Sequence, residues 1–266
     1  MLLKDVGIGL RFYAVGNTSS VGVWLTRAHG KLATRMKGHQ RATSRLLGQA
    51  DVFYTCELLF YARETRNVHI MKEVTPLAWR QRLREDWRAC ALASYLAWLA
   101  DRSMPFGPAG EGFFALLEEG LDQVANRSAG PATLLRFEAR WLALLGAMPE
   151  MGRCSRCGRA LAAGEDGVPG ADGHGLYCRD CAGEVVGAGE GAGSGWAALS
   201  GAGRAALAEL AEAGLPERAG LPAGVYREVE AVLGRMVAGA LELGAPSRER
   251  AAALEIVERR EGEAGR

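Results

Sequence analysis

The sequence predicts a multidomain α+β protein: an N-terminal five-stranded β-barrel, then an α-helical domain with an inserted knuckle. Three observations predict this class. Up to about residue 74 the apolar residues alternate or form short runs between turn residues, a pattern typical of strands. From residue 75 the apolar period changes to about 3.6, which indicates helices. Two CxxC pairs, separated by twenty residues, then mark a small loop-rich insertion.

Five candidate strands fill the N-terminal region, at residues 7–15, 21–28, 31–37, 52–62 and 68–74. A loop at 16–20 separates the first two, and a tight turn at 28–30 makes the second and third a hairpin. Five strands in about 75 residues suit a small closed barrel, with the OB-fold as the leading candidate. An open antiparallel sheet or an SH3-like barrel fits the pattern nearly as well.

Helices are predicted from Thr75 onwards. Thr75 is a suitable N-cap and Pro76 a suitable first helical residue, so we expect a long helix at 77–100. Further helices are predicted at 113–124, 131–147, 203–213 and 224–243. The expected domains are an OB-fold at 1–79, a helical domain at 80–150, a knuckle at 151–186, C-terminal helices at 196–247 that pack with the helical domain, and a charged tail at 248–266. A glycine-dense linker lies at 187–195.

The net charge is only +1, but the charge is unevenly distributed. Residues 1–79 hold eleven Lys/Arg against five Asp/Glu, a net charge of +6, whereas residues 80–266 carry −5. This asymmetry indicates that the N-terminal region meets a polyanion.

The basic residues concentrate in the segment 27–45, which has no acidic residue. Strand alternation places Lys31, Arg35 and Lys37 on one face, with Leu32 and Met36 on the other. A row of cations along a barrel strand, continuing into a basic loop, can follow a phosphate backbone. The predicted DNA-binding cations are Arg27, Lys31, Arg35, Lys37, Arg41 and Arg45; a solvated strand face is the alternative.

Trp24 is the candidate for base stacking, because alternation places it on the face opposite Val23 and Leu25. A place in the barrel core is the alternative for this residue. A second basic cluster opens the expected long helix and is weaker evidence, because Glu85 and Asp86 can pair with its cations. Its members are Arg80, Arg82, Arg84 and Arg88.

The cysteine pairs predict one structural zinc ion held by Cys154, Cys157, Cys178 and Cys181. Four thiolates fill a tetrahedral zinc and leave no open position for a substrate. A disulfide or a redox CxxC is the alternative, and His174 is an alternative ligand. Cys56 and Cys90 are isolated in apolar surroundings, which favours buried thiols and a reducing compartment.

No catalytic signature is found: the sequence lacks GxxxxGK[ST], HExxH and GxSxG. We therefore expect a binding protein rather than an enzyme. A zinc-stabilised interaction scaffold without DNA binding and a zinc-dependent enzyme are the competing hypotheses. The N-terminus has no basic region before a continuous apolar run, and no apolar stretch of about 18 residues occurs, so the expected location is the cytoplasm.

The chain resembles the bacterial recombination mediator family RecO. Residues 26–48 are similar to the family's T-x-x-x-G stretch with its later K-G and S-[RK] elements, and residues 148–158 and 176–181 are similar to its two CxxC halves. The order of basic barrel, helices and knuckle also matches. The C-terminal part, rich in Ala, Gly and Arg, carries little family signal and is typical of a high-GC genome.

The resemblance implies an OB-fold that binds single- and double-stranded DNA and anneals complementary strands. It further implies action with RecR to help RecA replace single-strand-binding protein during repair, without nucleotide hydrolysis. We expect a monomer that associates with the nucleoid when active.

Overall fold

The computed structural model describes residues 1–63, 68–126, 129, 132–170, 175–186, 198–212 and 221–241. The chain forms two compact units, Met1–Ser128 and Ala129–Arg266. The finer domain boundaries drawn from the sequence stay a prediction. His174, the 187–195 linker and the 248–266 tail lie outside the described residues.

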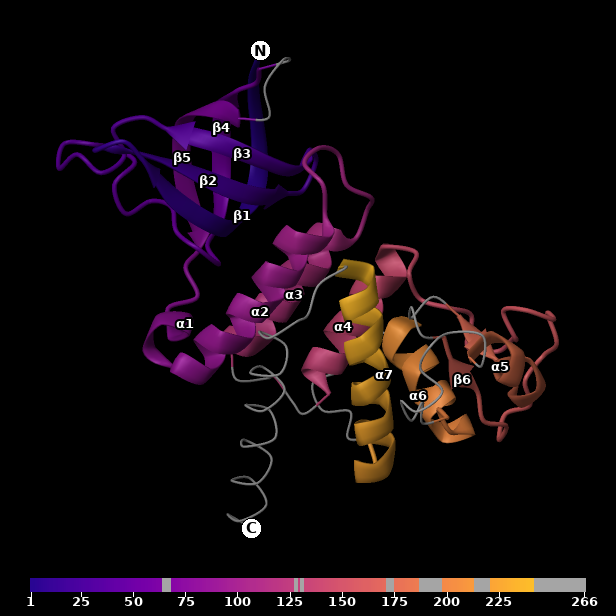
Figure 1. Ribbon diagram of the computed structural model, residues 1–266. Helices are drawn as coiled ribbons and strands as arrows, with labels where there is room; N and C mark the ends of the chain where they lie inside the picture. Colours follow the sequence, from indigo (N-terminus) through magenta and orange to yellow (C-terminus); the bar gives the residue numbers. More distant parts are fainter. Residues whose placement is uncertain are drawn as a thin grey trace, which may run out of the picture. The chain divides into compact units, whose positions relative to one another are not determined.

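The first unit begins with a closed five-stranded barrel (Figure 1). Its strands are β1 (Leu2–Val15), β2 (Ser19–Thr26), β3 (Gly30–Met36), β4 (Thr55–Tyr61) and β5 (Val68–Ala78). The strand order is β1-β2-β3-β5-β4, with β1 pairing β4 to close the barrel and β3 running parallel to β5. This is the predicted OB-fold, and the closure excludes the open sheet.

The predicted β2–β3 hairpin is confirmed: its turn lies at residues 27–29, and Gly30 is the first residue of β3. Gly30 has a φ of +67°, and an added Cβ would lie 2.3 Å from the carbonyl oxygen of Gly107. The reason is that the backbones of Lys31 and Gly107 exchange two hydrogen bonds. The loop before α3 therefore crosses the barrel at this turn, where only glycine fits.

The prediction of a helix cap at Thr75 is wrong, because β5 continues to Ala78. Thr75 pairs with Glu57 and Pro76 pairs with Cys56, next to a register irregularity in β4. Proline is tolerated in a strand at such irregular positions, where no ladder N–H is needed. Pairing with β4 therefore decided the conformation of a segment whose local sequence suits a helix start.

The helices of the first unit are α1 (Arg82–Glu85), α2 (Trp87–Ser103) and α3 (Phe113–Ala125). Asp86, rather than Thr75, caps the long helix: its side chain accepts hydrogen bonds from the backbone N–H groups of Arg88 and Ala89. The helices α2 and α3 lie side by side and both contact β1 (Figure 1).

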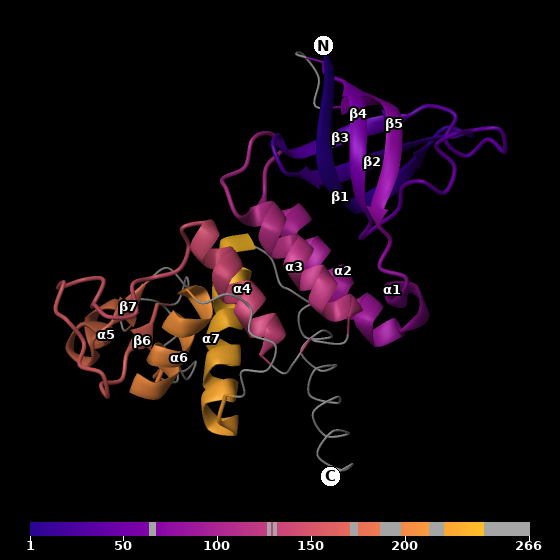
Figure 2. The same ribbon diagram turned by 180° about the vertical axis from the view of Figure 1, so that it is seen from behind.

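The second unit contains α4 (Thr133–Leu144), α6 (Gly201–Glu212) and α7 (Ala223–Leu241), which pack against one another (Figure 2). Between α4 and α6 lie the short strands β6 (Val168–Pro169) and β7 (Leu176–Tyr177), followed by α5 (Arg179–Val186). No helix within the described ranges is long and apolar enough to span a membrane.

Candidate functional site

Four cations of the basic segment are exposed. Arg35 lies on β3, and Lys37, Arg41 and Arg45 lie on the connection between β3 and β4. This connection is a series of turns joined by backbone hydrogen bonds, and it is tied to the β1–β2 turn by Gln40, whose N–H donates to the Thr18 carbonyl. Within the described part of the chain none of the four cations pairs with a carboxylate. Their charge is therefore directed to solvent.

Lys31 differs from these four cations. Alternation does place it on the same side of β3 as Arg35, but its side chain is only 6% exposed. The Lys31 ammonium pairs with Asp101 at 2.9 Å and donates to the carbonyl of Met104 at 2.9 Å. Since its donors are occupied by the last turn of α2 and by Met104 directly after it, Lys31 is a link between barrel and helix.

Arg27 is partly occupied by α3. Its guanidinium lies 3.6 Å from the Glu118 carboxylate and 4.8 Å from the centre of the Phe114 ring. The side chain is still 60% exposed, so the cation remains accessible to a polyanion.

The prediction of an outward-facing Trp24 is wrong, because this residue is completely buried. Its indole N–H donates to the Thr34 hydroxyl at 2.9 Å, and its ring packs edge-on against Phe12. In a small closed barrel the inward face needs large side chains, and here burial decided the orientation.

The second basic cluster is mostly engaged within the protein. Arg80 is buried, pairs with Asp122 at 2.7 Å and donates to the Phe53 carbonyl. Arg82 pairs with Asp86, and Arg84 pairs with Asp51. The remaining member, Arg88, lies over the ring of Trp87.

The exposure of two tryptophans was not predicted from the sequence, because a continuous helix was expected at 77–100. Trp79 is 49% exposed and Trp87 is 67% exposed. The available signal was the period-two alternation of β5, which continues through Leu77 to Trp79 on the outward side.

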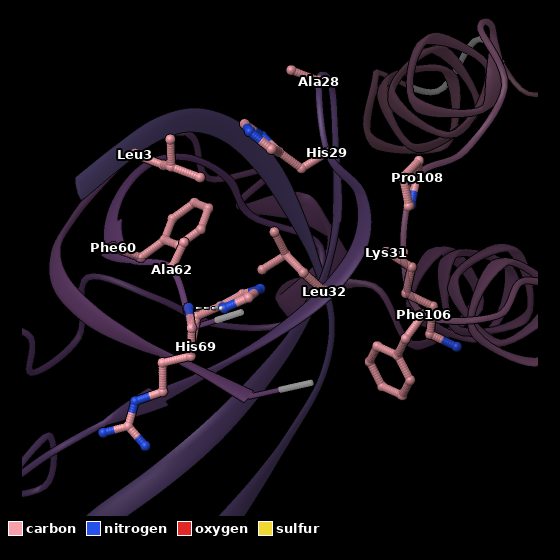
Figure 3. Close-up of a pocket in the computed structure, with 12 residues that line it drawn as sticks. Leu3, Ala28, His29, Lys31, Leu32, Phe60, Ala62, His69, Phe106 and Pro108 are labelled. Carbon is pink, nitrogen blue, oxygen red and sulfur yellow. Dashed lines mark hydrogen bonds between the residues drawn. The ribbon is translucent and has the colours of Figure 1, made fainter. Parts of the chain in front are cut away.

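A pocket of about 360 Å³ opens beside the β2–β3 turn (Figure 3). Its lining includes His29, Phe60 and His69, with Phe60 stacked on the His69 ring. His29 is held by the buried Asp5 carboxylate, at 2.6 Å from its Nδ1. Burial, and to a smaller extent the neighbouring His29, lowers the pKa of His69, so the His69 ring adds little positive charge at neutral pH.

The four predicted ligand cysteines converge in the second unit. Their sulfur atoms all lie within 4.8 Å of one another, and those of Cys157 and Cys178 are 4.0 Å apart. Four sulfurs around a tetrahedral zinc, at about 2.3 Å from the metal, are about 3.8 Å apart. The donor set and its spacing therefore fit a metal ion.

Backbone N–H groups favour the thiolate form at two of these sulfurs, those of Cys154 and Cys178. Burial opposes ionisation of Cys154, but N–H groups of Cys157, Cys178 and Arg156 directed at its sulfur outweigh burial and lower its pKa to about 6. The pKa of Cys178 is lowered chiefly by the N–H of Cys181. Four thiolates this close would repel one another, and a bound cation would offset that repulsion.

Arg204 of α6 holds the knuckle loop in place. Its guanidinium donates to three backbone carbonyls, those of Met151, Ala162 and Glu165. The backbones of Gly167 and Leu199 add a two-bond bridge. The cysteine cluster is thus anchored to the helix that follows it.

Comparison with known proteins agrees with this arrangement. A family profile described as "Recombination protein O C terminal" matches residues 84–204. A "DNA repair protein RecO" from Desulforudis audaxviator is 34% identical over 174 residues, which are 65% of this chain and 68% of that protein. Another from Moorella thermoacetica is 32% identical over 68% of this chain and 67% of that protein. A third, from Bacillus subtilis, is 27% identical over 59% and 61%.

The OB-fold barrel with its exposed cations, the helical region and the four-cysteine cluster thus occur together in this chain. About a third of the aligned residues, over about two thirds of the chain, are identical to those of the first two relatives. The chain belongs to the RecO family of DNA repair proteins.

Proposed function

We propose that this protein is a DNA-binding recombination mediator. It anneals complementary single strands and, with RecR, helps RecA replace single-strand-binding protein during DNA repair. The observation that carries the proposal is the group of exposed cations on β3 and the β3–β4 connection: Arg35, Lys37, Arg41 and Arg45. In the described part of the chain these side chains have no carboxylate partner, so they are available to phosphates.

Annealing requires two strands that repel each other to be brought together. A cationic surface that binds phosphates without reading bases screens this repulsion and leaves the base edges free to pair. Duplex formation is itself downhill, so the proposal needs no nucleotide hydrolysis and no catalytic residue. The site of action is the cytoplasm, at the nucleoid, and the protein acts as a monomer before it meets its partners.

The metal in this proposal is one structural zinc ion held by the four cysteines. Four thiolates leave no coordination position for water, so the ion stabilises the knuckle and takes no part in a reaction. Metal analysis of the purified chain should give one zinc per chain, and changing Cys154 to Ser should lower this value. Full zinc content in that variant would contradict the ligand assignment.

Charge reversal tests the DNA surface. In the variant Arg35→Glu/Lys37→Glu/Arg41→Glu, we expect the slope of log affinity against log salt for single strands to fall by about 2, at about 0.7 per lost phosphate contact. Fluorescence anisotropy with a labelled oligonucleotide at several salt concentrations measures this slope.

The matched control carries the same change of charge elsewhere in the first unit: Lys4→Glu/Lys72→Glu/Arg102→Glu. All three of these residues are exposed, and Lys4 and Lys72 already pair with Glu57 and Glu73. Equal losses in the two triple variants would contradict a specific surface. Binding without salt dependence in the wild-type protein would favour the interaction scaffold instead.

Annealing of complementary oligonucleotides coated with single-strand-binding protein tests the mediator role. The wild-type chain should accelerate annealing, and the charge-reversed variant should not. Unchanged annealing rates on adding the wild-type chain would contradict the proposal.

A further inference from the structure

An aromatic cluster lies at the end of the barrel where β4 begins and β5 ends. The rings of Tyr54 and Trp79 have centroids 5.3 Å apart and are tilted by 54°. The Arg84 guanidinium lies 4.8 Å from the centre of the Tyr54 ring and is held by Asp51 at 2.9 Å. We call Tyr54, Trp79 and Arg84 the tryptophan platform.

Trp79 is exposed although its neighbours hold it firmly. Tyr54, on which it packs, is buried, whereas 49% of the Trp79 surface remains open to solvent. Leu77, two residues earlier on the same side of β5, is 56% exposed. A supported indole of this kind presents a large apolar surface at little cost in side-chain entropy.

The backbone on both sides of the cluster is strained. Phe53 has a φ of +67° and Arg80 a φ of +48°, the two positive values among non-glycine residues of the described chain. These residues directly flank Tyr54 and Trp79, and the Arg80 guanidinium donates to the Phe53 carbonyl at 2.6 Å. Strained non-glycine residues that the surrounding structure fixes are concentrated at functional sites.

The connection that carries the exposed cations leads into this cluster. It begins after Met36, the last residue of β3, and ends at Thr55, the first residue of β4. Thr55 pairs with Ala78, the last residue of β5. Tyr54 is the last residue of this connection, so the segment with Lys37, Arg41 and Arg45 is continuous in the chain with the platform.

We propose that Trp79 stacks on an unpaired base of a single strand whose phosphates are bound by Lys37, Arg41 and Arg45. Tyr54 and Arg84 are positioning residues that support the indole from the protein side. Base–aromatic stacking accepts every base, which suits a protein that binds strands without reading their sequence. A duplex offers no such face, because its bases already stack on one another. The inference rests on the DNA-binding function proposed above and adds a preference for single strands.

The test compares Trp79→Ala with Trp79→Phe and, as a matched control, Trp87→Ala. The control removes a tryptophan that is 67% exposed and whose ring lies beneath the Arg88 guanidinium, outside the platform. The probes are a labelled poly-dT oligonucleotide and a duplex of the same length. We expect Trp79→Ala to lower single-strand affinity about tenfold, with duplex affinity and salt slope unchanged. Trp79→Phe should restore most of the loss, and Trp87→Ala should behave as the wild type.

Unchanged single-strand affinity in Trp79→Ala would overturn the platform, and an accompanying loss of binding to a partner protein would make the surface a protein interface. An equal loss on single strand and duplex would also overturn it, since a general fault in the barrel has that effect. Neither result contradicts the proposed function, provided that the DNA affinity of the wild-type protein falls with rising salt concentration. The proposed function itself would be contradicted by a different result, namely that the wild-type protein shows no salt-dependent binding to DNA.

Discussion

At the scale of single residues, burial separates cations that hold the fold from cations that face solvent. Lys31 and Arg35 are four residues apart on the same side of β3, and the sequence treats them as equivalent. Asp101 and the Met104 carbonyl occupy the Lys31 ammonium, whereas Arg35 remains exposed. Only residues seventy positions away in the chain make this difference.

Changing Lys31 to Met should destabilise the protein by about 2 kcal/mol. The substitution removes one partner of a buried ion pair and the donor to a buried carbonyl, although Arg11 still pairs with Asp101 at 2.7 Å. Urea unfolding measures the loss. The control Arg35→Met should change stability by less than about 0.5 kcal/mol, and equal effects of the two substitutions would contradict the structural role of Lys31.

Cys56 should resist alkylation in the folded protein. Burial raises its pKa to about 12, against a smaller opposing effect of Arg80. The raised pKa keeps the thiol protonated at pH 8, and the thiolate is the reactive form. Mass spectrometry after brief iodoacetamide treatment should find Cys56 unmodified while the half-buried Cys90 is already modified. Modification of Cys56 at the rate of Cys90 would show that the barrel opens.

At the scale of elements, strand pairing overrode local preference in β5. Thr75 and Pro76 are a good helix start by sequence, yet they continue a strand because β4 supplies partners as far as Ala78. Conversely, the helices expected at 113–124 and 203–213 occur almost as predicted, at Phe113–Ala125 and Gly201–Glu212. Such helices can be predicted because they depend on the local spacing of apolar residues. The end of a strand depends instead on its pairing partner, which lies far along the chain.

Arg204 provides a test at this scale. Changing it to Met leaves three carbonyls of the knuckle loop without their donor, and we expect a loss of about 3 kcal/mol in the second unit. Limited proteolysis should then cleave more rapidly between residues 151 and 170. Arg227, which is exposed and bonded within its own helix, gives the control variant Arg227→Met. Equal protease resistance of the two variants would contradict the anchoring role.

At the scale of the whole molecule, the proposed DNA surface and the cysteine cluster belong to different compact units. Metal removal by a chelator should therefore increase hydrogen exchange in residues 151–186 and leave exchange in the barrel unchanged. DNA affinity, measured in the same samples, should largely survive. Parallel loss of DNA binding and of barrel protection on chelation would contradict this independence.

The sequence by itself indicated five strands with a barrel as the leading candidate, the group of four cysteines and the resemblance to the family, because each depends on local patterns or on short spacings. The tertiary structure alone decided that Trp24 is buried, that Lys31 is an internal link and that Trp79 is exposed. Alternation shows that two residues share a side of a strand, but what covers that side comes from distant segments: here the loop after α2 covers Lys31, and barrel closure encloses Trp24. The sequence therefore identifies the basic segment as a group. Only the packed structure shows which of its cations are exposed and available for DNA.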